Sequence, residues 1–324
     1  MHKRFVNHCT IDLTIIPDGP ILIKSGKEGA DPTKPDMEFV ETYHGGGRSI
    51  YLPGSSLKGA IRAHAERIVR TVGSERYNSQ KPNTPWANDP LNDKYDYLKD
   101  ESGKDKSSYD IYKRSSFTDQ MFGNTSIASR VRIEDAYPDK DKAKPKVEER
   151  NGVAIDRVFG SVAVGPFNYQ VCTTGEFRTK IHLKNFTLAQ LGLIGLVLRD
   201  LNDGWFGLGF AKSRGLGTVQ VKFNSAVVQY PGCILTENRQ IRAIGSEKQW
   251  AINMLLGAGE FLEATEAQSY GFPTRDCQET PIAGDCMNFG FGVQLTWEGD
   301  GETGVPDLFI RAVKSWSSLL VGAK

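Results

Sequence analysis

The sequence lacks long apolar runs and paired cysteines, which excludes several classes of protein. Its most apolar stretch, Leu188–Leu198, is broken by Gln190 and is shorter than the roughly 20 residues that cross a bilayer. The first residues contain no apolar segment of a secretory signal. The five cysteines are scattered without any CxxC pair, which argues against a disulfide framework and a structural zinc site. We therefore expect a cytoplasmic protein with reduced thiols and no membrane partner.

An excess of either sign of charge is also nearly absent, because the 324 residues carry a net charge of only +1. The distribution of charge is less even. Residues 241–324 hold six Lys and Arg against eleven Asp and Glu, so this segment has a net charge of −5 and residues 1–240 have +6. A basic body with an acidic C-terminal segment is compatible with a nucleic-acid-binding face on the body. Chance asymmetry on a solvated surface explains the charges equally well.

Hydrophobic periodicity predicts an α+β fold. Period-two alternation indicates strands, and apolar residues three and four apart indicate helices. The predicted elements are a strand over 4–16, a helix over 56–72, strands over 126–137 and 176–184, a helix capped by Thr187 and a strand over 217–223. The order strand, helix, strand, strand, helix, strand is that of a ferredoxin-like (RRM-like) βαββαβ core.

Long segments separate these elements. Residues 17–52 are rich in Pro, Gly and Lys and are predicted to form a loop, and residues 73–120 form a polar insertion. A charged excursion begins at residue 138. We predict a core domain over 1–229 and a C-terminal extension over 230–324 of unknown role, with helical pieces near 247–268 and 307–321.

A glycine-rich loop over 204–217 is a candidate phosphate-binding segment. Its glycines, including Gly207, Gly209 and Gly215, allow positive φ angles and close approach of the backbone to a ligand. Exposed N–H groups of such a loop can bind an anion, and Lys212, Ser213 and Arg214 add side-chain donors. A plain glycine-rich connection is the alternative.

The turn PGSS at 53–56 is a second candidate. Hydroxyls of Ser55 or Ser56 are expected to cap the following helix, whose free N–H groups would bind a phosphate. Lys58 and Arg62 lie one turn apart and would extend the site. An ordinary helix cap with a solvated basic face explains the same residues.

Four motifs in order carry a family resemblance. They are LPGSSLKGAIR at 52–62, Phe122-Gly123 leading into RVRIEDA at 130–136, AIDRVFG at 154–160, and the glycine-rich loop. Together they resemble the CRISPR RAMP superfamily, and more closely the repeating backbone subunits of type III effectors. The resemblance covers roughly residues 5–225.

The resemblance implies a ribonucleoprotein role. Such subunits bind guide RNA (crRNA) and target RNA and assemble with other CRISPR effector subunits. A thumb hairpin, expected within 138–170, wedges into the guide–target duplex and flips a base pair. The IDR element is expected after this hairpin, which makes Arg157 a candidate RNA contact.

The resemblance also implies cleavage of the target RNA with Mg²⁺ or Mn²⁺, supported by an acidic residue in the loop before PGSS. Asp36 is the first candidate for this catalytic, metal-binding residue, and Asp31 is the second. A carboxylate can hold a divalent ion that polarises the phosphate. The alternative for either residue is a turn aspartate beside proline. His44 is a candidate for proton transfer, or an exposed loop residue.

Two other functions remain open from the sequence. The chain would be a non-catalytic backbone or capping subunit if the cleavage site has been lost. A metal-independent guide-processing endoribonuclease of the same superfamily is the third hypothesis.

One basic strand face is a further candidate for RNA contact. It is formed by Arg178, Lys180, His182 and Lys184, and it either lines an RNA groove or faces solvent.

Overall fold

The computed structural model describes residues 4–26, 35–78, 80, 84–91, 98–99, 103 and 106–321. These residues form antiparallel sheets and six α-helices, as expected for an α+β fold. Asp31 lies outside the described residues, so its candidacy stays a prediction. Within the described part of the chain, none of the helices has the length and apolar character needed to cross a membrane.

The central sheet has seven antiparallel strands in the order β15-β16-β9-β1-β8-β4, with β5 also paired to β8. Its strands are β1 (His8–Pro17), β4 (Val131–Ile133), β5 (Tyr137–Pro138), β8 (Phe177–Lys184), β9 (Val219–Tyr230), β15 (Asp285–Cys286) and β16 (Val293–Glu298). The four strands predicted for the core are neighbours in the order β9-β1-β8-β4. This order is consistent with a ferredoxin-like core.

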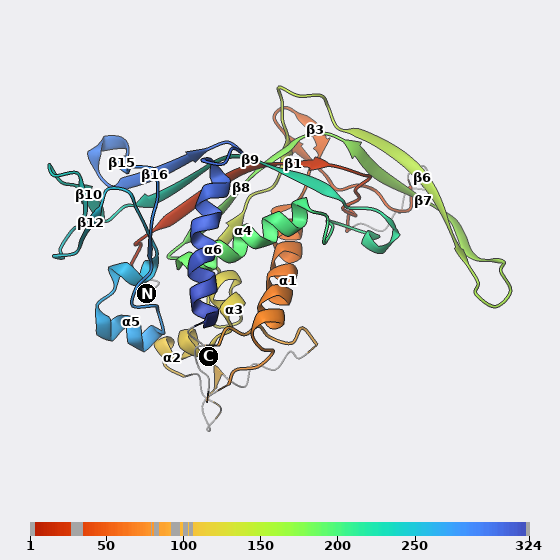
Figure 1. The fold of residues 1–324 in the computed structure, drawn as a ribbon. Coiled ribbons are helices and arrows are strands. Elements are labelled where there is room, and N and C mark those ends of the chain that lie inside the picture. The colour runs from red at the N-terminus through yellow and green to blue at the C-terminus, as the bar shows by residue number, and fades with distance from the viewer. Residues whose placement is uncertain are drawn as a thin grey trace.

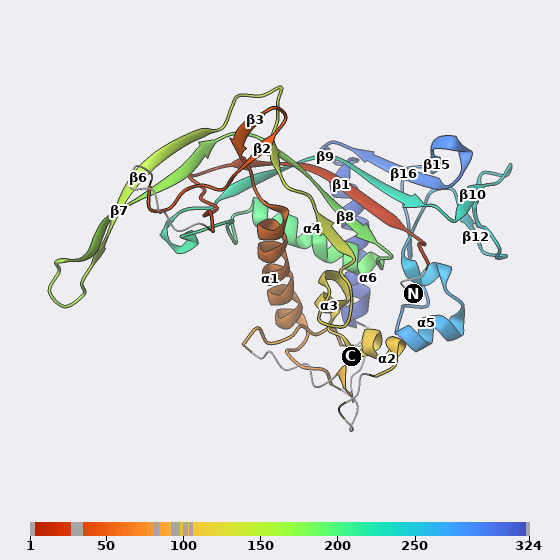
Figure 2. The ribbon, with the colours of Figure 1, turned by 180° about the vertical axis from the view of Figure 1, so that it is seen from behind.

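Helices cover one face of the sheet. Helix α1 (Gly54–Val72) follows β1 in the chain and α4 (Leu188–Asn202) connects β8 to β9, while α6 (Val305–Val321) packs beside α4. Figures 1 and 2 show these three helices on the same side of the strands. The shorter helices are α2 (Ser108–Arg114), α3 (Phe117–Phe122) and α5 (Ala264–Tyr270). Because α2 lies within 73–120 and α3 begins there, the predicted polar insertion is partly helical.

The alternation of β1 explains the two faces of the sheet. Cys9, Ile11, Leu13 and Ile15 are buried toward the helices, and each buried Ile or Leu side chain contributes about 1.5–3 kcal/mol. The opposite face carries polar side chains on β1 and the basic row on β8. Helix α4 begins as predicted, since Thr187 forms a capping box with Gln190. The sheet therefore has one face in the core and one polar face.

A long two-stranded hairpin projects from the sheet (Figures 1 and 2). It consists of β6 (Lys146–Ile155) and β7 (Val162–Thr174), and it extends the hairpin expected within 138–170 by a few residues. The IDR element was expected after the hairpin, and this expectation is wrong. The element forms the tip of the hairpin instead. There Asp156 Oδ1 accepts hydrogen bonds from the N–H groups of Val158 and Phe159, each at 2.8 Å. The motif aspartate therefore builds the turn of the hairpin.

Residues 17–26 and 35–52 contain more regular structure than the predicted loop. Residues 21–23 are buried, and β2 (Glu41–His44) pairs with β3 (Gly47–Ile50) across a Gly45-Gly46 turn. Both glycines have positive φ, as a two-residue hairpin turn requires. The strand predicted over 126–137 is shorter than expected, because the chain leaves the ladder between β4 and β5.

The C-terminal segment contains several short strands outside the central sheet. It contains β10 (Cys233–Leu235), β11 (Gln240–Ala243), β12 (Gln249–Ala251), β13 (Met254–Leu256) and β14 (Cys277–Glu279). The helix predicted near 247–268 is therefore wrong over 249–256, where pairing with β11 and β14 prevails over helical spacing. The helix predicted over 307–321 is confirmed as α6. The boundary at residue 229 stays a prediction; β16 and α6 extend the sheet and the helical layer of the core.

Candidate nucleic-acid interface

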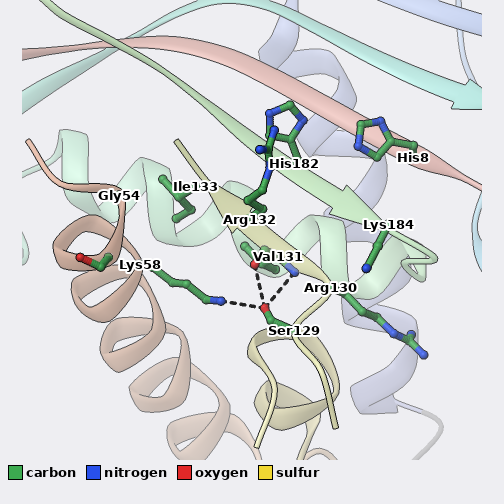
Figure 3. Close-up of a pocket in the computed structure, with 11 residues that line it drawn as sticks. His8, Gly54, Lys58, Ser129, Arg130, Val131, Arg132, Ile133, His182 and Lys184 are labelled. Atoms are coloured by element: carbon green, nitrogen blue, oxygen red, sulfur yellow. Dashed lines mark hydrogen bonds between the residues drawn. The ribbon is translucent and has the colours of Figure 1, made fainter. Parts of the chain in front are cut away.

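A groove of about 730 Å³ lies where the N-terminus of α1 meets the edge strand β4. Figure 3 shows Lys58 reaching from α1 toward Ser129, with Arg132, His182 and Lys184 along the strands. The groove is lined by His8, Gly54, Ser55, Lys58, Ser129, Arg130, Val131, Arg132, Ile133, His182 and Lys184. It thus joins the first turn of α1 to the polar face of the sheet.

The groove is basic. Its lining includes lysines and arginines but no carboxylate among the described residues. Glu134, just outside, accepts a hydrogen bond from Arg132 at 2.7 Å and contacts His182 Nε2 at 2.9 Å. Burial lowers the pKa of His8, and the nearby His182 lowers it further. A groove of this charge suits an anionic ligand such as a phosphate backbone.

The start of α1 is built by two of the sequence motifs. The Gly54 N–H donates to Asp135 Oδ1 at 2.7 Å, and Leu52 and Ala136 exchange two backbone hydrogen bonds. A side chain at Gly54 would come within 2.3 Å of the Ile133 carbonyl oxygen. Glycine is therefore required for this approach, and the PGSS turn and the EDA segment are two halves of one junction.

The prediction that a serine hydroxyl caps this helix is wrong. Helix α1 begins at Gly54, so Pro53 takes the cap position and makes no side-chain cap hydrogen bond. Ser55 and Ser56 lie within the first turn, where Ser55 is exposed and lines the groove. A carboxylate at a helix N-terminus is favoured by the helix dipole, so Asp135 replaces the cap.

Lys58 and Arg62 have different surroundings. Lys58 Nζ donates to Ser129 Oγ at 2.8 Å inside the groove, and partial burial, then Arg62, lower its pKa. Arg62 instead contacts Asp119 Oδ1 at 2.9 Å, Glu66 Oε1 at 2.8 Å and the Gly123 carbonyl at 3.0 Å. The structure thus brings Lys58 into the groove and directs Arg62 toward a fully buried carboxylate.

The glycine-rich loop packs against residues 20–22. The Phe210 N–H donates to the Leu22 carbonyl at 2.7 Å, and a side chain at Gly209 would lie within 2.2 Å of that oxygen. Gly207 approaches the Gly217 carbonyl in the same way. These glycines allow close backbone packing. Gly215, with φ +85°, borders open space beside the exposed Lys212, Ser213 and Arg214.

Asp36 lies beside the middle of strand β7. Its Oδ2 accepts a hydrogen bond from the Asn168 N–H of β7 at 2.9 Å, and the side chain is exposed. Met37 and Gln170 continue this pairing along β7. Among the residues that the structure describes, no three His, Cys, Asp or Glu side chains cluster in a way that would hold a metal.

The predicted RNA contacts thus fall in separate places. Ser55 and Lys58 share the groove, the glycine-rich loop follows α4, and Arg157 is exposed at the tip of the hairpin. Sequence reasoning missed Arg132 and Asp135 as individual residues, although both lie within a motif that it recognised. It could not find Asp135 because the Gly54 partner is 81 residues away.

An α+β fold with a polar sheet face and a basic groove defines a class of protein suited to a polyanionic ligand. The chain belongs to the RAMP superfamily, whose sequence model matches residues 14–220. Membership in this superfamily implies an RNA-binding role, with crRNA as the ligand within CRISPR complexes. A search of curated proteins finds no match to the chain.

Proposed function

We propose that this chain is a backbone subunit of a type III CRISPR effector with a ferredoxin-like core. In this role it binds guide RNA and supports cleavage of the paired target RNA beside a nucleotide displaced by the β6–β7 hairpin. The observation that carries the proposal is the junction of Gly54 with Asp135, because it joins two family motifs at the mouth of a basic groove. The same residues therefore carry the family signature and the candidate RNA contact.

The guide RNA would be held mainly through its phosphates. Lys58, Arg132 and Lys184 line the groove, and the exposed Lys212 and Arg214 form a second basic patch on the glycine-rich loop. Contacts of this kind bind RNA without reading its sequence. Binding through them should release counterions and weaken steeply as salt rises.

Cleavage would require a divalent ion, and the surroundings of Asp36 suit one mode of binding it. Mg²⁺ is often held by one or two carboxylates together with substrate phosphates and water. An exposed carboxylate fixed by the Asn168 amide supplies one such ligand. The ion, when bound, would polarise the scissile phosphate. Asp36 would hold the ion, and the hairpin amide would keep the carboxylate in place.

The test is cleavage of a target RNA by the assembled complex with Mg²⁺ present. Asp36→Ala is expected to abolish cuts while leaving guide binding intact. Asp18→Ala is a matched control, because Asp18 is also a carboxylate of the N-terminal segment and accepts a hydrogen bond from Gln220 instead. Unchanged cut sites in Asp36→Ala would show that the catalytic assignment is wrong.

A non-catalytic backbone subunit is the second candidate. It is favoured by the lack of a metal-ligating cluster among the described residues. If wild-type complexes bind target RNA but leave it uncut with Mg²⁺ or Mn²⁺, this second function holds.

A guide-processing endoribonuclease is the third candidate, because His8 and His182 lie in the groove with their rings stacked at 5.5 Å. Histidines can catalyse RNA cleavage by general acid–base chemistry. Cleavage by the isolated chain in EDTA would favour this function and overturn the first.

A further inference from the structure

Three aromatic rings form an exposed stack beside the PGSS turn. The ring of His44 lies on that of Tyr137 with centroids 3.7 Å apart and planes inclined by 10°. Tyr51 lies 5.8 Å from Tyr137 at 15°. His44 is exposed, whereas Tyr51 and Tyr137 are half-buried. The stack therefore presents flat aromatic surface to solvent.

The stack is held in place by local structure. His44 precedes the Gly45-Gly46 turn and pairs with Gly47, so no side chain opposes it across the hairpin. The Tyr137 hydroxyl donates to Asp135 Oδ2 at 3.3 Å. Rings fixed before binding lose little conformational entropy when a ligand stacks on them.

The stack is connected to the groove. Asp135 accepts the Tyr137 hydroxyl with one oxygen and the Gly54 N–H with the other, and Gly54 lines the groove. Tyr137 also pairs with Arg178 of β8, whose side chain is 56% exposed. A ligand that fills the groove with an anionic part can therefore place a neighbouring part on the rings.

The surroundings favour a nucleobase over an apolar peptide. The groove is basic, Lys140 lies against Gly45, and Arg178 stands beside Tyr137. Alternating phosphates and bases match a basic groove next to an aromatic surface, since proteins bind single-stranded RNA by this combination of charge and stacking. An apolar peptide would need an apolar rim instead.

We propose that His44, Tyr137 and Tyr51 form a stacking platform for an unpaired base of the bound RNA. The inference rests on the proposed function only in that the ligand is RNA. The base would stack on the exposed His44 ring while its neighbouring phosphate lies at the start of α1. Stacking of this kind is tolerant of sequence, because every base has a flat aromatic face.

The test uses the full chain and a single-stranded oligouridylate carrying 2-aminopurine, whose fluorescence falls when it stacks. Wild-type protein should quench the probe. His44→Ala should lose most of the quenching and bind the RNA about 10-fold more weakly, whereas His44→Phe should restore both. Tyr43→Ala is the matched control, because Tyr43 is an 81% exposed aromatic residue on the same strand.

An abasic oligomer separates stacking from a general effect on the fold. Its affinity should be the same for wild type and His44→Ala. Equal quenching by His44→Ala and wild type, or salt-dependent binding by wild type without quenching, would overturn the platform and leave the proposed function standing. Failure of wild type to bind RNA at all would contradict both.

Discussion

The Gly54 amide and the Asp135 carboxylate meet at 2.7 Å, across 81 residues of sequence. This one contact begins α1, fixes the end of β4 and brings two motifs together. It takes the place of a local helix cap, because Pro53 at the cap position offers no side-chain acceptor.

Removal of this contact should destabilise the protein. We expect Asp135→Ala to lower the free energy of unfolding by about 1–2 kcal/mol, as the loss of a helix cap does. Asp135→Asn should lose less, since its side-chain oxygen still accepts from Gly54. Denaturant unfolding measures both, and Asp141→Ala, at an exposed aspartate nearby, should change nothing. A loss equal to that of Asp135→Ala in the control would contradict the capping role.

Substitutions at Lys58 and Arg62 should have different effects, the first on RNA binding and the second on stability. Lys58→Ala is expected to weaken RNA binding and to reduce the slope of log affinity against log salt by about 1, with little effect on unfolding. Arg62→Ala should instead lower the free energy of unfolding by about 3 kcal/mol, because the buried Asp119 loses its charged partner.

Salt titrations of RNA affinity and denaturant unfolding of both variants check this contrast. Arg67→Ala, an exposed basic residue on the same helix, is the control for nonspecific loss of charge. If Arg62→Ala instead unfolds like wild type and loses RNA affinity as Lys58→Ala does, Arg62 contacts RNA and the structural role assigned to it is wrong.

Two glycines of the loop should respond differently to alanine. Gly209→Ala must displace the Leu22 carbonyl and should lose about 2 kcal/mol or more of stability. Gly215→Ala meets open space and bears only the strain of positive φ, about 1 kcal/mol. Thermal unfolding measures the difference. Equal losses would show that close packing does not decide the choice of glycine at 209.

Stability should fall between acidic and neutral pH because of Asp276. This carboxylate accepts N–H donors from Leu188 at 2.9 Å and Gly259 at 3.1 Å, but burial raises its pKa to about 7, with Glu260 adding to the shift. The fold therefore favours the protonated acid. Its stabilising effect is complete below the ordinary carboxyl pKa near 4 and is lost as pH rises through about 7.

Thermal unfolding of wild type and Asp276→Asn at pH 5 and pH 8 isolates this group. The difference in unfolding temperature between the two pH values should be smaller in the variant, which cannot ionise at 276. Asp285→Asn, at an exposed position, should keep the wild-type difference. Identical pH dependence in Asp276→Asn and wild type would show that another group controls it.

Elements with one buried face were predictable from the sequence. In β1 and β8 each apolar residue alternates with a polar one, and α4 starts at a capping box. The β6 strand gave no such signal, because none of its residues is buried. Strands β12 and β13 were predicted as helix, because pairing with distant strands is invisible to local spacing.

The candidate site was predictable only in part. Ser55 and Lys58 were found because a helix start with basic residues is a local pattern, and the structure places both in the groove. Arg62 has the same spacing, but its direction depends on Asp119, which is distant in sequence. The roles assigned to Asp36 and to the glycine-rich loop remain predictions. The aromatic stack joins residues 44, 51 and 137, which no spacing rule connects.

The β6–β7 hairpin contacts the loop that holds Asp36, the candidate catalytic residue. Its base is tied to the body where Ile21 pairs with Cys172, and Asp36 and Met37 bond to the middle of β7. Beyond those ties, β6 and β7 pair with each other and the ribbon projects away from the sheet (Figure 1). A small rotation at the base sweeps the tip through a much larger arc. Because Asp36 Oδ2 accepts a hydrogen bond from the Asn168 N–H of β7, a change in the angle of the ribbon would move the Asp36 carboxylate with it.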